Sequence, residues 1–191
     1  MVVFNQIQES DEYESLKNWL SPEEYQKLSN TQKYQLALDR YNNRNKSQWE
    51  IGIEYERFIG YLYEQKGFKV KYHGALLGLE DMGRDLIVYK PDETLVIQCK
   101  RWMKEKTIHE KHIFQLYGSV VEMSIENKSQ KYKGVFITTA SLSDIAKKCA
   151  DYLGIEYLEN YKIVNYPLIK CNITKDGEKI YHLPFDQQYD R

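Results

Sequence analysis

Cysteine is scarce in this chain, and the cysteines present are poorly placed to cross-link it or to hold a structural metal. The three are Cys99, Cys149 and Cys171, and no two of them form a C-x-x-C pair. A disulfide framework needs an even set of cysteines, and a structural zinc site needs closely spaced thiolates. The pattern therefore argues against both and favours a reducing, cytoplasmic location.

Long apolar runs are also missing. No stretch of the sequence approaches the roughly 18 to 20 apolar residues that a membrane-spanning helix needs. The N-terminus lacks the basic region and apolar stretch of a secretory signal. The 191 residues are 42% apolar and 29% charged, which is ordinary for one globular domain with extensions. We expect a cytoplasmic protein that does not contact a membrane.

A large excess of charge of one sign is absent too, because the formal net charge is only -1. The molecule as a whole therefore does not attract nucleic acid strongly. The charge is uneven, however: residues 100–112 carry five Lys or Arg and two His against two Glu. A local basic patch of this kind suits a phosphodiester substrate, although the run alone equally fits a solvated charged loop.

Two peripheral segments flank the densest apolar pattern. Residues 1–48 form a polar lead-in with a helix start at Ser21, where a capping box and a proline at the first helical position coincide. Residues 161–191 contain two short strand-like runs around Asp176-Gly177, a strong hairpin turn signal. Neither segment has the apolar density for its own core. We expect an N-terminal helical extension and a C-terminal hairpin with an extended tail.

Residues 49–160 have the pattern of the folded core. Apolar side chains at helical spacing predict a first helix from Trp49 to Gln65. A later helix is expected to open at Thr107 in a capping box with Glu110. The remaining elements are expected to be strands at 68–72, 85–89, 94–100, 134–139 and 154–158, with a helix from Ser141 before the last strand. The order α-β-β-β-α-β-α-β predicts an α/β fold, a mixed sheet flanked by helices.

The most informative stretch runs from Gly83 to Trp102 and contains two of these strands. Because side chains alternate along a strand, Gln98 and Lys100 project from one face and Cys99 from the other. Asp85 beside that pair would place an acid, an amide oxygen and an ammonium at the end of an apolar hairpin. Such a group can bind a hard divalent cation and hold water next to a phosphate. A surface hairpin with a polar outer face is the simpler alternative.

The combination of G-x-D, twelve residues and Q-x-K followed by an aromatic resembles the Mrr-type restriction endonucleases of the PD-(D/E)xK nuclease superfamily. The resemblance covers roughly Trp49 to Leu158. It includes an aromatic-Glu pair, Tyr55-Glu56, set about eleven residues before Gly67-Phe68. The resemblance implies a restriction-endonuclease-like core and a magnesium-dependent endodeoxyribonuclease, with Mn²⁺ as a substitute metal and no small-molecule cofactor.

The resemblance also implies a role for each matching residue. Asp85 matches the metal-binding aspartate, and Gln98 occupies the second acidic position of the superfamily, which removes one negative charge from the site. The Cys99 backbone carbonyl would complete the metal ligands, and Glu56 matches the first-helix acid. Lys100 matches the lysine that orients the attacking water and stabilises charge on the phosphate. A surface glutamate at Glu56 and a solvent-facing lysine at Lys100 remain the alternatives.

DNA would be bound by residues around and after the motif. The expected contacts are with Arg101, Trp102, Lys104, Lys106, Lys111, His112 and Gln115. Core packing is the alternative for Trp102, and a helix-surface position is the alternative for Gln115.

The implied context is restriction, phage defence or DNA processing by a mobile element. Two alternatives stay open: a structure-selective nuclease resembling archaeal Holliday-junction resolvases, and a nucleic-acid-binding module without turnover. A homodimer is expected, since cutting both strands of a duplex calls for two sites. Its interface would use the lead-in or the hairpin, whose apolar residues are Trp19, Tyr34, Ile169, Ile180 and Phe185. Packing of these residues on the back face of the domain itself is the alternative.

Overall fold

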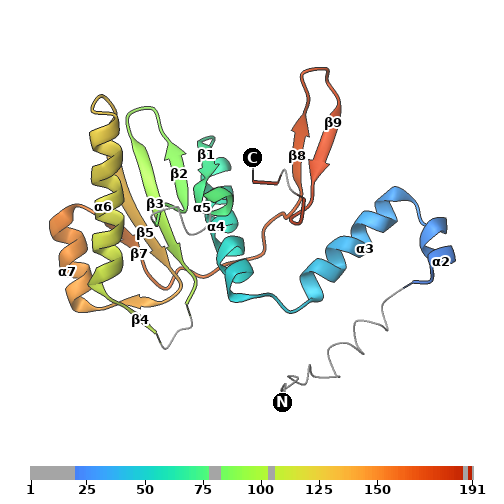
Figure 1. Ribbon diagram of the computed structural model, residues 1–191, viewed down its shortest axis with the longest axis horizontal. Coiled ribbons are helices and arrows are strands. Elements are labelled where there is room, and N and C mark those ends of the chain that lie inside the picture. Colours follow the sequence, from blue (N-terminus) through green and yellow to red (C-terminus); the bar gives the residue numbers. More distant parts are fainter. Residues whose placement is uncertain (1–19, 78–82, 103–105, 187–188, 191) are drawn as a thin grey trace, which may run out of the picture. The chain divides into compact units, whose positions relative to one another are not determined.

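The computed structural model describes residues 20–77, 83–102, 106–186 and 189–190. The chain divides into a smaller compact unit, 1–44, and a larger one, 45–191 (Figure 1). Trp19 and Lys104, expected at a subunit interface and on DNA respectively, lie outside the described residues. In the described part of the chain, no helix has both the length and the apolar character needed to cross a membrane.

The smaller unit contains two helices, α2 (Pro22–Lys27) and α3 (Asn30–Asn43). The predicted capping box at the start of α2 is present, because the Glu24 N–H donates to Ser21 Oγ and the Ser21 N–H donates to a Glu24 carboxylate oxygen. α3 begins with a second capping box at Ser29. These caps satisfy the N–H groups that the first turn of each helix leaves without partners.

A five-stranded mixed sheet in the order β1-β2-β3-β5-β7 forms the centre of the larger unit. β1 and β2 pair antiparallel, as do β2 and β3, whereas β5 is parallel to both β3 and β7. The strands are β1 (Lys69–Tyr72), β2 (Leu86–Tyr89), β3 (Thr94–Lys100), β5 (Tyr132–Thr138) and β7 (Glu156–Leu158). The predicted α/β fold with a mixed sheet is confirmed.

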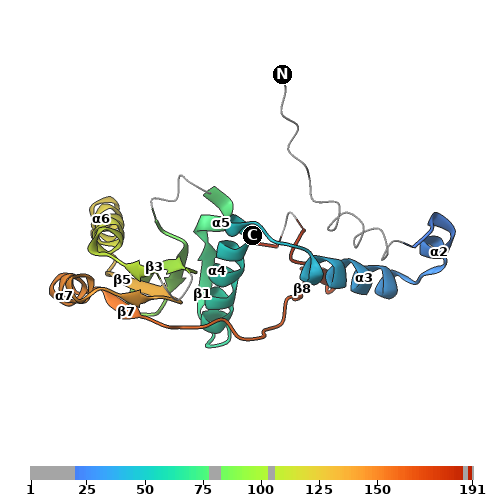
Figure 2. The ribbon, with the colours of Figure 1, turned by 90° about the horizontal axis from the view of Figure 1, so that it is seen from below.

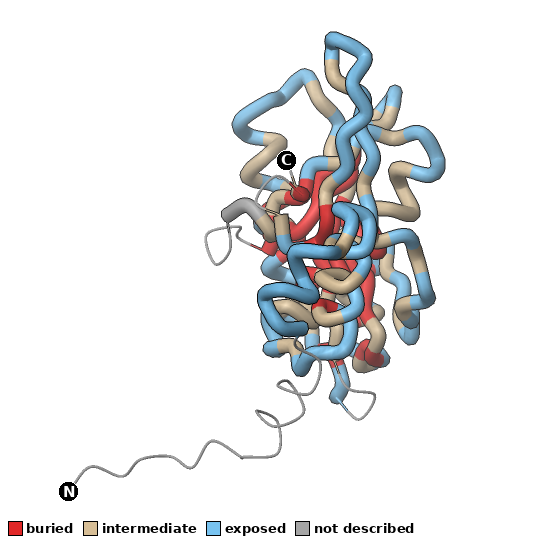
Figure 3. Tube along the Cα trace, turned by 90° about the vertical axis from the view of Figure 1, so that its right-hand side faces the viewer, coloured by how far each residue is buried: buried red, intermediate tan, exposed pale blue. Residues whose placement is uncertain are grey.

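Helices cover both faces of this sheet (Figure 2). α4 (Gln48–Glu64) packs Tyr55 and Phe58 against Ile97 of β3 in one apolar cluster. α6 (Glu110–Glu126) and α7 (Asp144–Leu153) pack against the opposite face in a second cluster. Central strand β3 is therefore buried on both sides for almost its whole length, and buried residues gather in the interior of the unit (Figure 3). A strand in this position can hold polar side chains rigidly.

The expectation of a helix opening at Thr107 is wrong. Thr107 and Ile108 form a short strand, β4 (Thr107–Ile108), parallel to β6 (Ser141–Leu142), and α6 begins only at Glu110. Ile108 is fully buried and its carbonyl accepts a hydrogen bond from the Ser143 N–H at 2.9 Å. Burial of Ile108 and this pairing outweigh the local capping signal. A short helix, α5 (His73–Leu77), follows β1 and was not among the expected elements.

The predicted C-terminal hairpin is present as β8 (Lys170–Ile173) and β9 (Lys179–His182). Gly177 lies in its turn at φ +83°, a conformation that favours glycine. The segment after β9 does not extend away from the unit. Leu183 and Tyr189 are each only 2% exposed and are buried within the larger unit, whereas the Phe185 side chain stays exposed.

Candidate functional site

Asp85 lies immediately before β2 and is held there by the backbone of its neighbours. Its N–H donates to the Ile97 carbonyl at 2.9 Å, and its carbonyl accepts from the Gly74 N–H at the same distance. Its side-chain Oδ2 accepts a hydrogen bond of 2.5 Å from the Cys99 N–H. The carboxylate is buried, at 5% exposure, and has a fixed orientation. The Cys99 N–H thus supplies a hydrogen-bond donor to this buried carboxylate.

Cys99 contributes its backbone to this site and its side chain to the core. The N–H and C=O of a residue in a strand point to the same side, so the Cys99 carbonyl lies on the side of Asp85. The thiol packs in the apolar cluster beneath α4. Burial raises the pKa of the thiol well above its ordinary value, and the carboxylates of Asp85 and Glu56 raise it further. Cys99 therefore offers a carbonyl oxygen, and not a thiolate, as a possible ligand.

Gln98 projects from the face of β3 opposite to the Cys99 side chain. Its Nε2 lies 3.5 Å from the Gln115 Oε1 on α6, at the limit of a hydrogen bond. Its Oε1 is buried and has no hydrogen-bond partner among the described residues. A buried amide oxygen without a partner costs free energy unless it meets a donor or a cation. This atom therefore indicates a ligand site next to Asp85 and Lys100.

Gly83, the glycine of G-x-D, packs directly against these amides. It has φ +78°, and a Cβ added there would lie 2.6 Å from the Gln98 Nε2 and 2.9 Å from the Gln115 Nε2. Only glycine therefore fits without moving both glutamines. The sequence marked Gly83 as part of the motif, but its contact with the amides appears only in the structure.

Lys100 ends β3 on the same face as Gln98 and is half-buried. The backbone around it is fixed by Thr139, whose N–H donates to the Lys100 carbonyl at 3.1 Å. The Thr139 hydroxyl also accepts from the Trp102 N–H at 2.9 Å and donates to the Trp102 carbonyl at 2.7 Å. Thr139, which sequence reasoning missed, thus holds the exit of the strand after the lysine.

Glu54 and Glu56, two of the glutamates of α4, have different surroundings, as their positions on the helix require. Glu56 is buried at 9% exposure, and its charge acts on the Cys99 thiol. Glu54 forms ion pairs with Lys46 and, at 3.6 Å, with Arg101. Glu56 therefore lies on α4 near the Cys99 side chain, whereas Glu54 is held by Lys46 and Arg101.

The expected DNA contacts fall into two groups. Lys106 and Lys111 are exposed, with the Lys106 ammonium 5.4 Å from the centre of the Trp102 ring. Arg101 is engaged by Glu54, and its Nη1 also donates to the Ile51 carbonyl at 3.4 Å. The two lysines can meet a phosphate directly, whereas Arg101 ties β3 to α4.

His112 lies half-buried between aromatic rings. The Trp102 ring meets it edge-on at 5.2 Å between centroids, and the Phe136 ring lies 6.4 Å away. Burial, with the positive charge of Lys100 next in size, lowers the pKa of His112 to about 4. The ring is therefore neutral near pH 7 and adds no positive charge for a phosphate.

Several oxygen donors of different kinds could hold a cation here. Among the described residues, no three His, Cys, Asp or Glu side chains gather closely enough to hold a metal alone. The available donors are the Asp85 carboxylate, the Gln98 Oε1 and the Cys99 carbonyl, with Glu56 nearby. Mg²⁺ prefers oxygen ligands, keeps several waters and accepts few protein groups. The donor set and the orphaned amide oxygen fit such an ion.

Comparison with known proteins gives a family match and a set of remote structural likenesses. The sequence model of the Mrr catalytic domain, described as a restriction endonuclease, matches residues 50–166. No curated protein matches the chain. A repair endonuclease from Pyrococcus abyssi is 20% identical, with a TM-score of 0.43 over 62% of this chain and 50% of that one.

Two further solved structures are similar at the same level. An EndoMS complex with double-stranded DNA is 22% identical, with a TM-score of 0.43 over 60% of this chain and 46% of that one. The MspJI restriction endonuclease with a 27-mer oligonucleotide is 15% identical, with a TM-score of 0.42 over 74% of this chain and 32% of that one. The chain thus spans about half or less of the length of these structures.

Proposed function

The chain belongs to the Mrr-type restriction endonuclease family, and from this premise we propose that it is a magnesium-dependent endodeoxyribonuclease. Its site would consist of Asp85, Gln98, Lys100 and Glu56. One observation carries the proposal: the buried Gln98 Oε1 has no hydrogen-bond partner among the described residues. The next residue along β3, Cys99, donates the backbone N–H that fixes Asp85. The biological setting would be restriction, phage defence or mobile-element DNA processing.

The metal would be held by the Asp85 carboxylate, the Gln98 Oε1 and the Cys99 carbonyl, with Mn²⁺ able to replace Mg²⁺. When bound, the ion supplies positive charge against the scissile phosphate and activates water for attack. Gln98 is neutral where many related sites have an acid, so Asp85 and Glu56 provide the negative charge that attracts the cation. The substrate phosphate itself would add further negative charge.

The protein side chains then perform three tasks. Asp85 would bind the metal ion, and the Cys99 N–H already orients its carboxylate for this task. Lys100 donates to the attacking water and afterwards offsets the charge that develops on the phosphate. Glu56 orders water from the α4 side. Because β3 is a buried central strand, Gln98 and Lys100 keep their spacing during the reaction.

DNA would run over the segment after β3, where Lys106 and Lys111 meet phosphates. Trp102, His112 and Gln115 would line the path from the α6 side, and Arg101 would act mainly through its contact with Glu54. Residues 1–48 and 161–191 would be extensions of a nuclease core at 49–160.

We also propose a homodimer. The hairpin and its surroundings leave apolar side chains open to solvent: Ile169 is 42% exposed, Ile180 39% and Phe185 47%, and Tyr34 in the smaller unit is 44% exposed. A second copy could cover them and bring a second site to the other strand of a duplex. Light scattering at tens of micromolar, with and without DNA, tests this, and a monomer in both would refute it.

The test of the activity is plasmid cleavage with Mg²⁺ or with EDTA. Wild-type protein should cut only with Mg²⁺, and Asp85→Asn and Lys100→Ala should each lose roughly a thousandfold or more in rate. Exposed residues give matched controls, Asp92→Asn and Lys128→Ala, which should cut like wild type. Circular dichroism should show all four variants folded. Binding without any cleavage would instead identify a nucleic-acid-binding module.

A further inference from the structure

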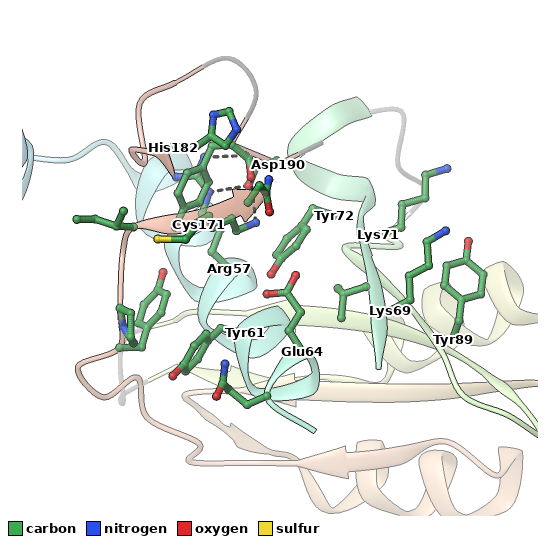
Figure 4. A pocket seen from close by; sticks show the side chains of 18 residues that line it. Arg57, Tyr61, Glu64, Lys69, Lys71, Tyr72, Tyr89, Cys171, His182 and Asp190 are labelled. Carbon is green, nitrogen blue, oxygen red and sulfur yellow. Dashed lines mark hydrogen bonds and ion pairs between the residues drawn. The ribbon is translucent and has the colours of Figure 1, made fainter. Parts of the chain in front are cut away.

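A pocket of about 610 Å³ lies between α4, β1 and the C-terminal hairpin (Figure 4). Its size falls within the range of small-molecule sites, about 300 to 1,000 Å³. None of the residues assigned above to catalysis lines it. The pocket is therefore separate from the candidate nuclease site.

The segment after β9 closes one side of the pocket through Arg57 of α4. The Arg57 guanidinium forms two hydrogen bonds with the Asp190 carboxylate, at 2.9 and 2.6 Å, and a third with the Pro184 carbonyl at 2.9 Å. It also lies 4.5 Å from the centre of the Tyr189 ring. A bidentate Arg–carboxylate pair is a strong and directional contact. Arg57 and Asp190 thus neutralise each other and form a rigid wall.

Lys170 is a second cationic side chain that lines the pocket, and it also has partners. Its ammonium donates to the Tyr189 carbonyl at 3.0 Å and lies 3.9 Å from the centre of the Tyr72 ring. Burial lowers the pKa of Lys170, while the Glu64 carboxylate raises it in compensation. Lys170 is therefore a half-buried donor held against aromatic rings, with Glu64 within electrostatic reach.

Glu64 and Tyr72 provide the polar groups at the centre of the pocket, where their oxygens face each other (Figure 4). Burial raises the pKa of Tyr72, and Glu64 raises it further, so the hydroxyl keeps its proton and can donate. Gly60 allows the Tyr72 ring to lie against α4, because a Cβ there would be 2.5 Å from the ring. The centre of the pocket thus combines a carboxylate acceptor with hydroxyl and ammonium donors.

Aromatic side chains supply a further wall. Tyr61 of α4 and Tyr166 lie 5.6 Å apart between ring centroids, and both line the pocket. Tyr166 is anchored by its hydroxyl, which donates to the Glu54 carbonyl at 3.3 Å. Tyrosine faces of this kind stack well on flat heterocycles.

These groups select the ligand class. A phosphate is disfavoured inside, because Arg57 and Lys170 already have partners and the Glu64 carboxylate would repel an anion. A carboxylate beside donors and aromatic rings instead matches the edge of a nucleobase that has an exocyclic amino group. Lys69 and Lys71 on the rim are exposed and could meet flanking phosphates. We propose that this pocket binds one unpaired, amino-bearing nucleobase: adenine, cytosine or guanine.

The sheet connects the pocket with the candidate nuclease site. Tyr72 is paired with Leu86, the residue that follows Asp85, and neighbouring strands lie about 4.8 Å apart. A base leaving the duplex near a phosphate at Asp85 thus has the pocket close by. This part rests on the proposed function, since it takes DNA as the source of the base. A free nucleotide would offer the same chemistry.

The experiment measures binding in EDTA, where the proposed cleavage does not occur. Dye-labelled duplexes with one bulged A, C, G or T, and a fully paired duplex, are titrated by fluorescence anisotropy. Bulged A, C and G should bind at least about fivefold more tightly than bulged T, because thymine has no amino group. Glu64→Leu removes the acceptor and should bring the ratio close to one, whereas Glu126→Leu, on the exposed end of α6, should keep it. Tyr61→Ala should weaken all bulged duplexes alike by removing stacking.

Equal affinity for the four bulges in wild type, or an unchanged ratio in a folded Glu64→Leu variant, would overturn the pocket assignment. Plasmid cleavage with Mg²⁺ is scored separately, so cleavage without base preference refutes the pocket and leaves the nuclease proposal intact. A Glu64-dependent preference without cleavage supports the pocket and refutes the nuclease. Competition by free AMP and CMP, but not TMP, supports the pocket and identifies a free nucleotide as its ligand.

Discussion

The Cys99 N–H donates a hydrogen bond of 2.5 Å to the Asp85 Oδ2, which joins the ends of two neighbouring strands through one carboxylate. This bond explains how an acid can be buried at the end of an apolar hairpin, because a buried charge needs hydrogen-bond donors. It also fixes the acid relative to Gln98 and Lys100, whose side chains alternate with that of Cys99 along β3. The geometry of the site is thus determined mainly by backbone.

Gln98 should control metal affinity. Gln98→Glu is expected to retain cleavage and to lower the Mg²⁺ concentration at half-maximal rate, because it adds a negative charge to a site for a hard cation. Gln98→Ala should raise that concentration and reduce the rate. Magnesium titrations of plasmid cleavage measure both. If Gln98→Ala shows an unchanged titration and rate, the residue has only a structural role.

Gly83→Ala should damage both stability and activity. The φ of +78° is unfavourable for alanine, and the new Cβ would lie 2.6 Å from the Gln98 Nε2. We expect a loss of about 1 kcal/mol or more in the free energy of unfolding, with reduced cleavage. Gly118→Ala is the control, because nothing lies within 4 Å of its Cβ position in α6, and it should stabilise the protein slightly. Urea unfolding of both variants decides between these outcomes.

Salt should weaken DNA binding steeply in spite of the near-neutral net charge. Lys106→Ala and Lys111→Ala should each reduce the slope of log affinity against log salt by about one unit, since each removes one phosphate contact. Arg101→Ala should change the slope less and lower thermal stability, because Arg101 is paired with Glu54. Lys128→Ala serves as the control. A slope that is the same in all four variants would contradict a phosphate path over this segment.

His112 should make the protein less stable in mild acid. Its pKa falls from an ordinary 6.5 to about 4 in the folded state, so between these values the unfolded chain binds a proton that the native ring does not. The contribution of this depressed pKa is present above pH 6.5 and is lost as the pH falls toward 4. His112→Gln should therefore differ from wild type most at pH 7 and least near pH 4. Urea unfolding at several pH values would show a constant difference if this interpretation is wrong.

Local patterns in the sequence predicted the elements whose formation depends on neighbouring residues. The capping box at Ser21, the turn at Gly177 and the alternation of Gln98, Cys99 and Lys100 are of this kind, because each follows from the chemistry of adjacent positions. The catalytic roles assigned to these side chains stay predictions.

Contacts between distant segments could not be predicted in the same way. Thr107 has a good local capping sequence, but it pairs with Ser141, which is 34 residues away, and forms a strand. Gly83 was visible as a motif glycine, while its contact with the Gln98 amide depends on how the loop before β2 returns to the sheet. The pocket is the extreme case, since its wall joins Arg57 to Asp190, and no periodicity in the sequence relates them.

That separation of 133 residues between Arg57 and Asp190 has a consequence for the newly made protein. At about 5 to 20 residues per second, the ribosome adds Asp190 roughly 7 to 27 s after Arg57. During this interval α4, which carries Glu56, lacks the contacts made by Pro184, Tyr189 and Asp190. The motif strands are complete well before then. A growing chain therefore passes through a period in which the motif strands are complete but the C-terminal segment does not yet hold α4 in place.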